Sequence, residues 1–106
     1  MKERYLQELY KGLINLNDGF DAAPIHYFSE EDFRILLRRA EQLKIGILGI
    51  EPWLNGQYYY TVTAEDTNSD PTDPQWYTKA FEDFVATGLE LYYAATYFIP
   101  DQNNNE

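Results

Sequence analysis

Residues 45–62 read IGILGIEPWLNGQYYYTV, and this stretch decides the fold. Apolar and aromatic residues lead up to Asn55-Gly56 and continue directly after it. Asn and Gly are the residues that accept the two positive φ angles of a type I′ turn, and such a pair between apolar runs is typical of a tight hairpin. The stretch therefore predicts an antiparallel β-hairpin.

The turn also predicts the register of this hairpin. A strict two-residue turn sets three opposing pairs, namely Trp53 with Tyr58, Glu51 with Tyr60, and Gly49 with Val62. Both faces are largely apolar, which favours a hairpin covered on both sides, or covered by helices on one side and by a partner on the other. Pro52 has no N–H to donate, so it is expected at an outward edge position or in a loosened turn end.

Two helices are predicted ahead of the hairpin. In residues 2–16, leucines and tyrosines recur at three- and four-residue spacings, and 17–19 (Asn-Asp-Gly) is expected to end this helix. Ser29 and Asp32 have the spacing of a capping box and predict the start of the second helix, whose first turn is rich in acids. Between the two helices, 25–28 is a candidate short strand.

A long helix is predicted at the C-terminal end. Residues 64–74 have the Asp, Asn, Ser and Pro content of an exposed loop, with Asp73 as the cap of the helix and Pro74 in its first turn. From Tyr77 to Phe98, mostly apolar residues recur at alternating steps of four and three, and Pro100 is expected to end the helix.

These elements predict the class and the domain organisation. The fold class is α+β, with two N-terminal helices, a central antiparallel hairpin with a candidate third strand, and a long C-terminal helix packed on the sheet. Residues 1–100 are expected to form one domain, and 101–106 to be a polar, disordered tail.

The composition points to a soluble protein of a reducing compartment. The chain has 106 residues and no cysteine, which excludes disulfides and thiolate metal sites and favours the cytoplasm. Its charged opening, MKERYLQELY, lacks the pattern of a secretory signal, and no apolar run is long enough to span a membrane.

The net charge of −10 is concentrated in the second half of the chain. Residues 1–44 contain eight acidic and seven basic residues, whereas 45–106 contain ten acidic residues and one base, Lys79. This imbalance argues against direct binding of nucleic acid or anionic membranes and favours a basic partner. The alternative is that the acidity serves solubility alone.

No motif supports catalysis or a cofactor. His26 is the sole histidine, and no serine or threonine lies in a nucleophile motif. Glu51, set among aromatic residues, is a candidate general acid or base, but the sequence offers no clear second carboxylate. We therefore predict a protein that is not an enzyme.

One loop partly matches a calcium site. Asp66, Asn68 and Asp70 reproduce the alternating oxygen ligands of a calcium-binding loop. The match ends there, because Pro71 stands where the sharp turn needs glycine and Tyr77 where a bidentate glutamate is required. We expect a solvated acidic loop and no metal.

The abundance of aromatic residues favours a protein interface. Ten tyrosines and two tryptophans are a heavy load for this length, and such side chains combine a large contact area with a polar tip. The predicted contact surface is Glu51, Trp53, Tyr58, Tyr59, Tyr60, Glu65, Asp66, Asp70 and Asp73.

From this surface we predict a small acidic module that binds a basic protein partner. Toxin-immunity proteins act in this way, although the comparison rests on size and charge alone. The alternatives are a structural homodimer, in which the hairpin or an aromatic helix face pairs with a second copy, and a mimic of nucleic acid.

Overall fold

The computed structural model describes residues 2–99, so Pro100 and the predicted tail at 101–106 lie outside the described residues. The described chain is α+β, as predicted, and folds into α1 (Lys2–Tyr10), α2 (Glu30–Leu43), β1 (Gly46–Leu54), β2 (Gln57–Tyr58), β3 (Val62–Thr63), α3 (Pro74–Val85) and β4 (Leu91–Phe98). Within residues 2–99, no helix has the length and hydrophobicity that a membrane span requires.

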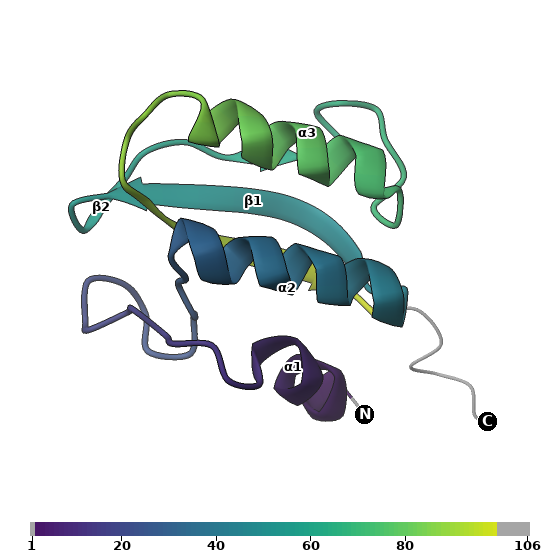
Figure 1. Cartoon of the computed structure of the whole chain (residues 1–106), viewed down its shortest axis with the longest axis horizontal. Coiled ribbons are helices and arrows are strands. Elements are labelled where there is room, and N and C mark those ends of the chain that lie inside the picture. The colour runs from purple at the N-terminus through teal and green to yellow at the C-terminus, as the bar shows by residue number, and fades with distance from the viewer. Residues whose placement is uncertain (1, 100–106) are drawn as a thin grey trace.

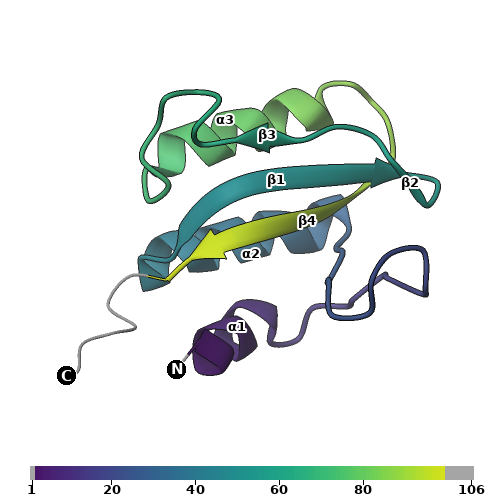
Figure 2. The same ribbon diagram turned by 180° about the vertical axis from the view of Figure 1, so that it is seen from behind.

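Strand β1 is the centre of an antiparallel sheet. The short strands β2 and β3 pair with one of its edges and β4 with the other. Helices α2 and α3 lie together on one face of this sheet, and α1 packs beside α2 (Figures 1 and 2). The helical face of the sheet therefore forms the main core.

The predicted helix starts are confirmed. The Ser29 hydroxyl accepts a hydrogen bond from the backbone N–H of Asp32 at 3.2 Å and caps α2. The Asp73 carboxylate accepts from the N–H of Gln75 at 2.9 Å and caps α3, with Pro74 in the first turn. Both caps satisfy donors that a helix leaves unpaired, so local sequence suffices to place them.

The first helix is shorter than predicted. It ends at Tyr10 and does not reach residue 16, because Gly12 has a φ of 78° that a right-handed helix does not allow. The guanidinium of Arg39, on α2, donates to the carbonyl oxygens of Leu9 at 2.9 Å and Lys11 at 2.7 Å. Arg39 thus satisfies carbonyls that the early helix end leaves free.

The prediction of a long C-terminal helix is wrong. Helix α3 ends at Val85, Gly88 takes a φ of 77°, and the chain then runs along β1 as β4. The spacing of apolar residues continued through this turn by coincidence. As a strand, β4 pairs along nearly the full length of β1. It thereby provides hydrogen-bond partners for the second edge of β1, which a helix could not do.

Tyr93 anchors β4 to the helices. Its ring stacks on Phe33 of α2 with centroids 5.2 Å apart and meets Phe81 of α3 edge-on at 5.1 Å, and the side chain is buried. Its backbone N–H and carbonyl exchange 2.8 Å hydrogen bonds with Phe28. This bridge is all that forms of the candidate strand at 25–28.

The hairpin forms at the predicted turn, but its register changes part of the way along. Asn55 and Gly56 have φ angles of 54° and 76°, and Trp53 lies opposite Tyr58 as predicted. Further along, Val62 pairs with Ile50, so the predicted pairing of Val62 with Gly49 is wrong by one residue.

The register changes because of one extra residue. Between the two paired regions, β1 contributes two residues and the returning strand three, 59–61, so Glu51 is not paired with Tyr60 as predicted. Pro52 lies at this point in the buried central strand, not at an edge. Its carbonyl accepts from the N–H of Tyr59 at 3.1 Å, but its nitrogen has no hydrogen to return, and the ladder breaks there.

Replacing Gly88 with alanine distinguishes the observed turn from a continuous helix. At a positive φ, alanine is expected to lower the free energy of unfolding by about 1–2 kcal/mol, whereas inside a helix it would raise it by about 1 kcal/mol. Chemical denaturation gives the sign. Gly88→Asn, which tolerates the left-handed region better, should cost less; a stabilising Gly88→Ala would contradict the turn.

Two buried tyrosines predict a loss of stability at alkaline pH. Burial, with smaller effects of neighbouring carboxylates, raises the pKa of both Tyr77 and Tyr93 from 10.0 to about 12. Below pH 10 each phenol is neutral in both states, and between pH 10 and 12 it ionises on unfolding only. The free energy of unfolding should then fall by about 1.4 kcal/mol per pH unit for each tyrosine.

Denaturation across this range, followed together with tyrosinate absorbance, measures that slope. Tyr77→Phe removes one of the tyrosines with a raised pKa and should reduce the slope by the contribution of that group. A stability independent of pH between 10 and 12 would exclude the shift.

Candidate binding groove

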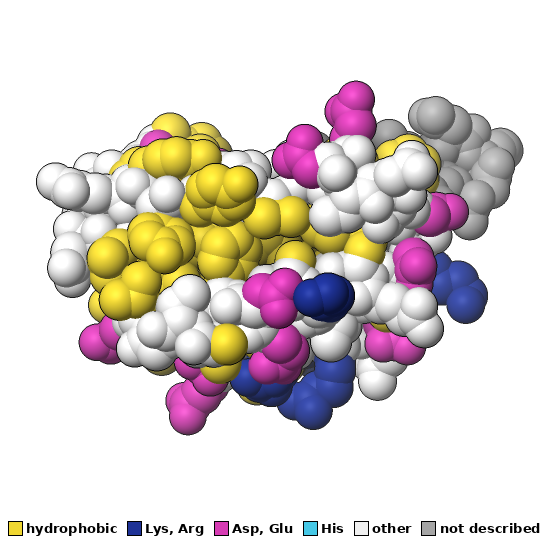
Figure 3. Space-filling model, turned by 90° about the horizontal axis from the view of Figure 1, so that it is seen from above, with side chains coloured by type: hydrophobic (Ala, Val, Ile, Leu, Met, Phe, Trp, Pro, Cys, Tyr) yellow, Lys and Arg dark blue, Asp and Glu magenta, His cyan; other side chains and the backbone are white. Residues whose placement is uncertain are grey.

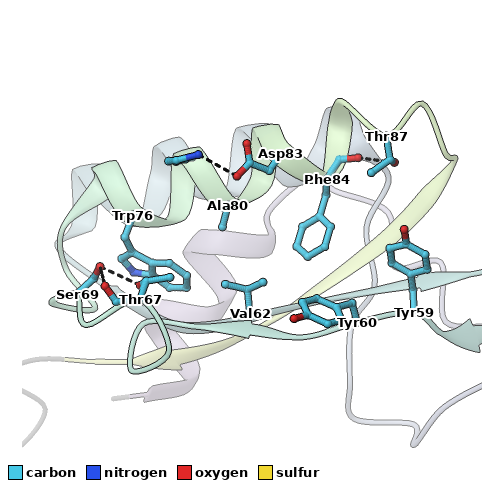
Figure 4. Close-up of a pocket in the computed structure, with 11 residues that line it drawn as sticks. Tyr59, Tyr60, Val62, Thr67, Ser69, Trp76, Ala80, Asp83, Phe84 and Thr87 are labelled. Atoms are coloured by element: carbon cyan, nitrogen blue, oxygen red, sulfur yellow. Dashed lines mark hydrogen bonds and ion pairs between the residues drawn. The ribbon is translucent and has the colours of Figure 1, made fainter.

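An apolar groove of about 810 Å³ lies between α3 and the returning strand (Figure 4). It begins where the hairpin ladder is broken and runs along α3 toward the loop 64–73. Its lining is Tyr59, Tyr60, Val62, Thr67, Ser69, Trp76, Lys79, Ala80, Asp83, Phe84 and Thr87.

One wall of the groove is a single face of α3. Trp76, Ala80 and Phe84 are spaced four residues apart, which places them on the same side of the helix. These three side chains are only 6–8% exposed, because the returning strand and the loop cover them from the other side. The wall is therefore a partly covered extension of the main core.

The other wall is formed by the interrupted strand. The rings of Tyr59 and Tyr60 meet Phe84 edge-on, with centroids 6.5 and 6.3 Å apart. Tyr59 is 39% exposed and Tyr60 is 56% exposed. Regular pairing would place successive side chains on opposite faces of the sheet, but the extra residue at 59–61 brings both tyrosines to α3.

The rim of the groove is polar. Thr67 and Ser69 share a 2.9 Å hydrogen bond at the loop end, and the Thr87 hydroxyl donates to the carbonyl of Phe84 at 2.7 Å. On α3, Lys79 Nζ lies 3.0 Å from Asp83 Oδ2. The groove thus offers an apolar floor with one exchangeable ion pair at its edge.

The segments that form the groove are acidic in composition. Figure 3 shows apolar side chains gathered in one continuous area on this side of the molecule, with acidic and basic side chains beyond it. Residues 45–99 contain eight acidic residues and a single base, Lys79. This part of the chain, which includes every residue of the lining, therefore has a net charge of −7, which favours a cationic ligand.

The predicted aromatic surface is divided between the two faces of the sheet. Tyr59 and Tyr60 lie in the groove, but Trp53 and Tyr58 contact each other edge-on on the opposite face, with centroids 6.4 Å apart. Trp53 is also covered by Phe20, at 5.4 Å, from the segment between α1 and α2. The four aromatic residues therefore do not form one contact surface.

The carboxylate of Glu51 is held by hydrogen bonds to other side chains of this chain. Its carboxylate accepts a 2.6 Å hydrogen bond from the indole N–H of Trp53 and lies 3.5 Å from the Tyr27 hydroxyl, which donates to Asp21 at 2.5 Å. Burial, with the hydrogen bond to Asp21 and the charge of Glu51, raises the pKa of Tyr27 well above its ordinary value. This cluster fixes the segment between α1 and α2 to the sheet.

Three of the four loop acids support the loop itself. Asp66 accepts from the N–H of Thr63 at 3.3 Å. Asp70 accepts from the N–H and hydroxyl of Thr72, which lowers its pKa, and Asp73 caps α3. None of them, nor Glu65, lines the groove. Their charge reaches the groove only as part of the acidic surroundings.

His26 and the calcium-like loop show no arrangement for chemistry. The His26 ring stacks on Tyr10 with centroids 4.5 Å apart, and its Nδ1 lies 3.3 Å from the carbonyl oxygen of Pro24. In the part of the chain that the structure describes, no group of three or more His, Asp or Glu side chains is placed to hold a metal ion.

Sequence reasoning missed the α3 side of the groove. Phe84 was predicted only as part of the regular apolar spacing of the long helix, and neither Lys79 nor Asp83 was predicted to belong to a contact surface. Their signal was present in the apolar arc of this helix, which is wider than one packing partner requires. The missing information was which element leaves that arc partly uncovered.

Comparison with family models, with curated proteins and with solved structures found no match for this chain.

Replacing Glu51 tests whether this carboxylate is structural. Because it accepts a charge-assisted hydrogen bond from Trp53, we expect Glu51→Ala to lower the free energy of unfolding by about 1.5–3 kcal/mol. The matched control is Glu65→Ala, at an exposed loop position, which should change it by less than about 0.5 kcal/mol. Equal effects of the two variants in chemical denaturation would contradict this role.

Proposed function

We propose that this chain is a small protein-binding module, that the groove beside α3 is its contact site, and that its partner is a basic protein. The observation that carries the proposal is the pair of half-exposed tyrosines, Tyr59 and Tyr60, over an apolar floor in acidic surroundings. Aromatic side chains of this kind, with an apolar ring and a polar tip, are enriched at the centres of protein interfaces.

The groove supports binding better than catalysis. The hydroxyls of Thr67, Ser69 and Thr87 each lie within hydrogen-bond distance of a backbone carbonyl, and no histidine lies in the lining to activate them. Asp83 faces Lys79, and no second carboxylate lines the groove. An acyl or glycosyl transfer would need an activated nucleophile or a pair of positioned carboxylates.

The charge of the chain supports a basic partner. A field of one sign accelerates association with an oppositely charged protein and disfavours phosphate-rich surfaces. The absence of cysteine favours a reducing compartment, so we propose the cytoplasm as the place where the two proteins meet.

Two tyrosines offer a matched test of the contact site. Tyr60 and Tyr58 are 56% and 57% exposed, but only Tyr60 lines the groove. The tagged chain is used to capture proteins from its source cells, and the captured protein is identified, purified and titrated. Tyr60→Ser should weaken binding by about 2 kcal/mol, roughly thirtyfold, whereas Tyr58→Ser should leave it nearly unchanged.

The charge of the partner is a separate readout of the same titration. Association with a basic protein should slow as salt is added. Equal losses for the two tyrosine variants, or an acidic partner, would contradict the proposal.

A further inference from the structure

Asp83 lies at the edge of the groove (Figure 4). Its carboxylate lies on α3 one turn after Lys79, and both side chains line the groove beside Phe84. We propose that the groove takes a short segment of the partner in which an arginine or lysine lies next to an aliphatic or aromatic residue. The apolar side chain covers Phe84 and Tyr60, and the cation replaces Lys79 at Asp83. This inference rests on the protein-binding function proposed above.

The ion pair between Lys79 and Asp83 is easily exchanged. The two side chains are 77% and 67% exposed, and the base precedes the acid along the helix, which is the weaker order for such a pair. An incoming cation therefore gains a carboxylate at little cost. Once Asp83 is occupied, Lys79 can move into solvent on its flexible stem.

The neighbouring acid on α3 is held differently. Glu82 pairs with Arg34 of α2, which also contacts Glu30 at 3.4 Å and lies over the Phe81 ring at 4.9 Å. Arg34 thus ties two helices together and leaves Glu82 engaged away from the groove. Of the two adjacent acids, Asp83 is the one that lines the groove with an exchangeable partner.

Charge complementarity selects the occupant. A second copy of this chain would bring its own net charge of −10 to the acidic surroundings of the groove. Residues 100–106, PDQNNNE, contain no lysine or arginine and no large apolar side chain, so they lack both groups that the groove would bind. A segment of a basic protein supplies the cation and the apolar contact together.

Two capped synthetic peptides test the proposal. The first is Leu-Arg-Leu-Arg-Leu, and the second has citrulline, a neutral side chain of nearly the same shape, in place of each arginine. Each is titrated into the labelled full-length chain at low ionic strength, and binding is followed by the amide signals of residues 79–87 and the indole signal of Trp76.

The arginine peptide should bind about three- to fivefold more tightly than the citrulline peptide, which is the effect of one exposed ion pair. Asp83→Asn should remove this preference. Glu65→Gln makes the same change of charge outside the groove and should preserve it. Lys79→Gln removes the competing cation and should increase the preference by about twofold.

The outcomes separate this inference from the proposed function. Equal affinity for the two peptides, or no change in the signals of residues 79–87, would overturn the role of Asp83. Equal loss of the preference in Asp83→Asn and Glu65→Gln would overturn it too, by showing that general acidity is responsible. In each case the comparison of Tyr60→Ser with Tyr58→Ser still decides whether the groove is the contact site.

Discussion

The missing N–H of Pro52 is the constraint on which this structure depends. Pro52 lies in the central strand, where neighbours on both edges require backbone donors and acceptors. Opposite β4 it pairs with Tyr93. Tyr93 exchanges its own backbone hydrogen bonds with Phe28, on its other side, so no donor is needed from the proline there. On the other edge only the carbonyl of Pro52 can bond, and the returning strand loses its register.

That local defect connects the fold to the proposed site. A regular hairpin would have alternated its three tyrosines between the two faces of the sheet. Instead Tyr58 stays with Trp53 on one face, while Tyr59 and Tyr60 both reach Phe84 on the other. The groove is thus a consequence of the interrupted ladder. Its aromatic wall is formed by residues 59 and 60, which lie outside the paired strands.

The parts of the fold that local sequence determines could be predicted. The caps at Ser29 and Asp73 and the turn at Asn55-Gly56 depend on a few adjacent residues. Strand β4 was missed because its apolar residues happened to continue the helical spacing, and because the short connection at 86–90 gives a weak signal in which only Gly88 has a positive φ. Without β4 the hairpin had no second neighbour, so a proline in a central strand could not be foreseen.

The candidate site was predicted only in part for a related reason. Of the predicted contact surface, Tyr59 and Tyr60 line the groove, and the other members belong to different environments. Glu51 is bound by Trp53, and Asp66 by the backbone of Thr63. Which face each side chain occupies depends on the register change and on the packing of distant segments. Neither can be read from residue types alone.

The loop that follows β3 occupies the outward backbone groups of Thr63, at the edge of the sheet. Ala64 donates to Leu48 of β1, so the backbone of Thr63 faces outward, where a strand from another molecule would pair. There the Asp66 carboxylate accepts from the Thr63 N–H, and the Thr67 N–H donates to the carbonyl of Thr63. At Thr63, therefore, neither backbone group is left free to pair with a strand of another molecule.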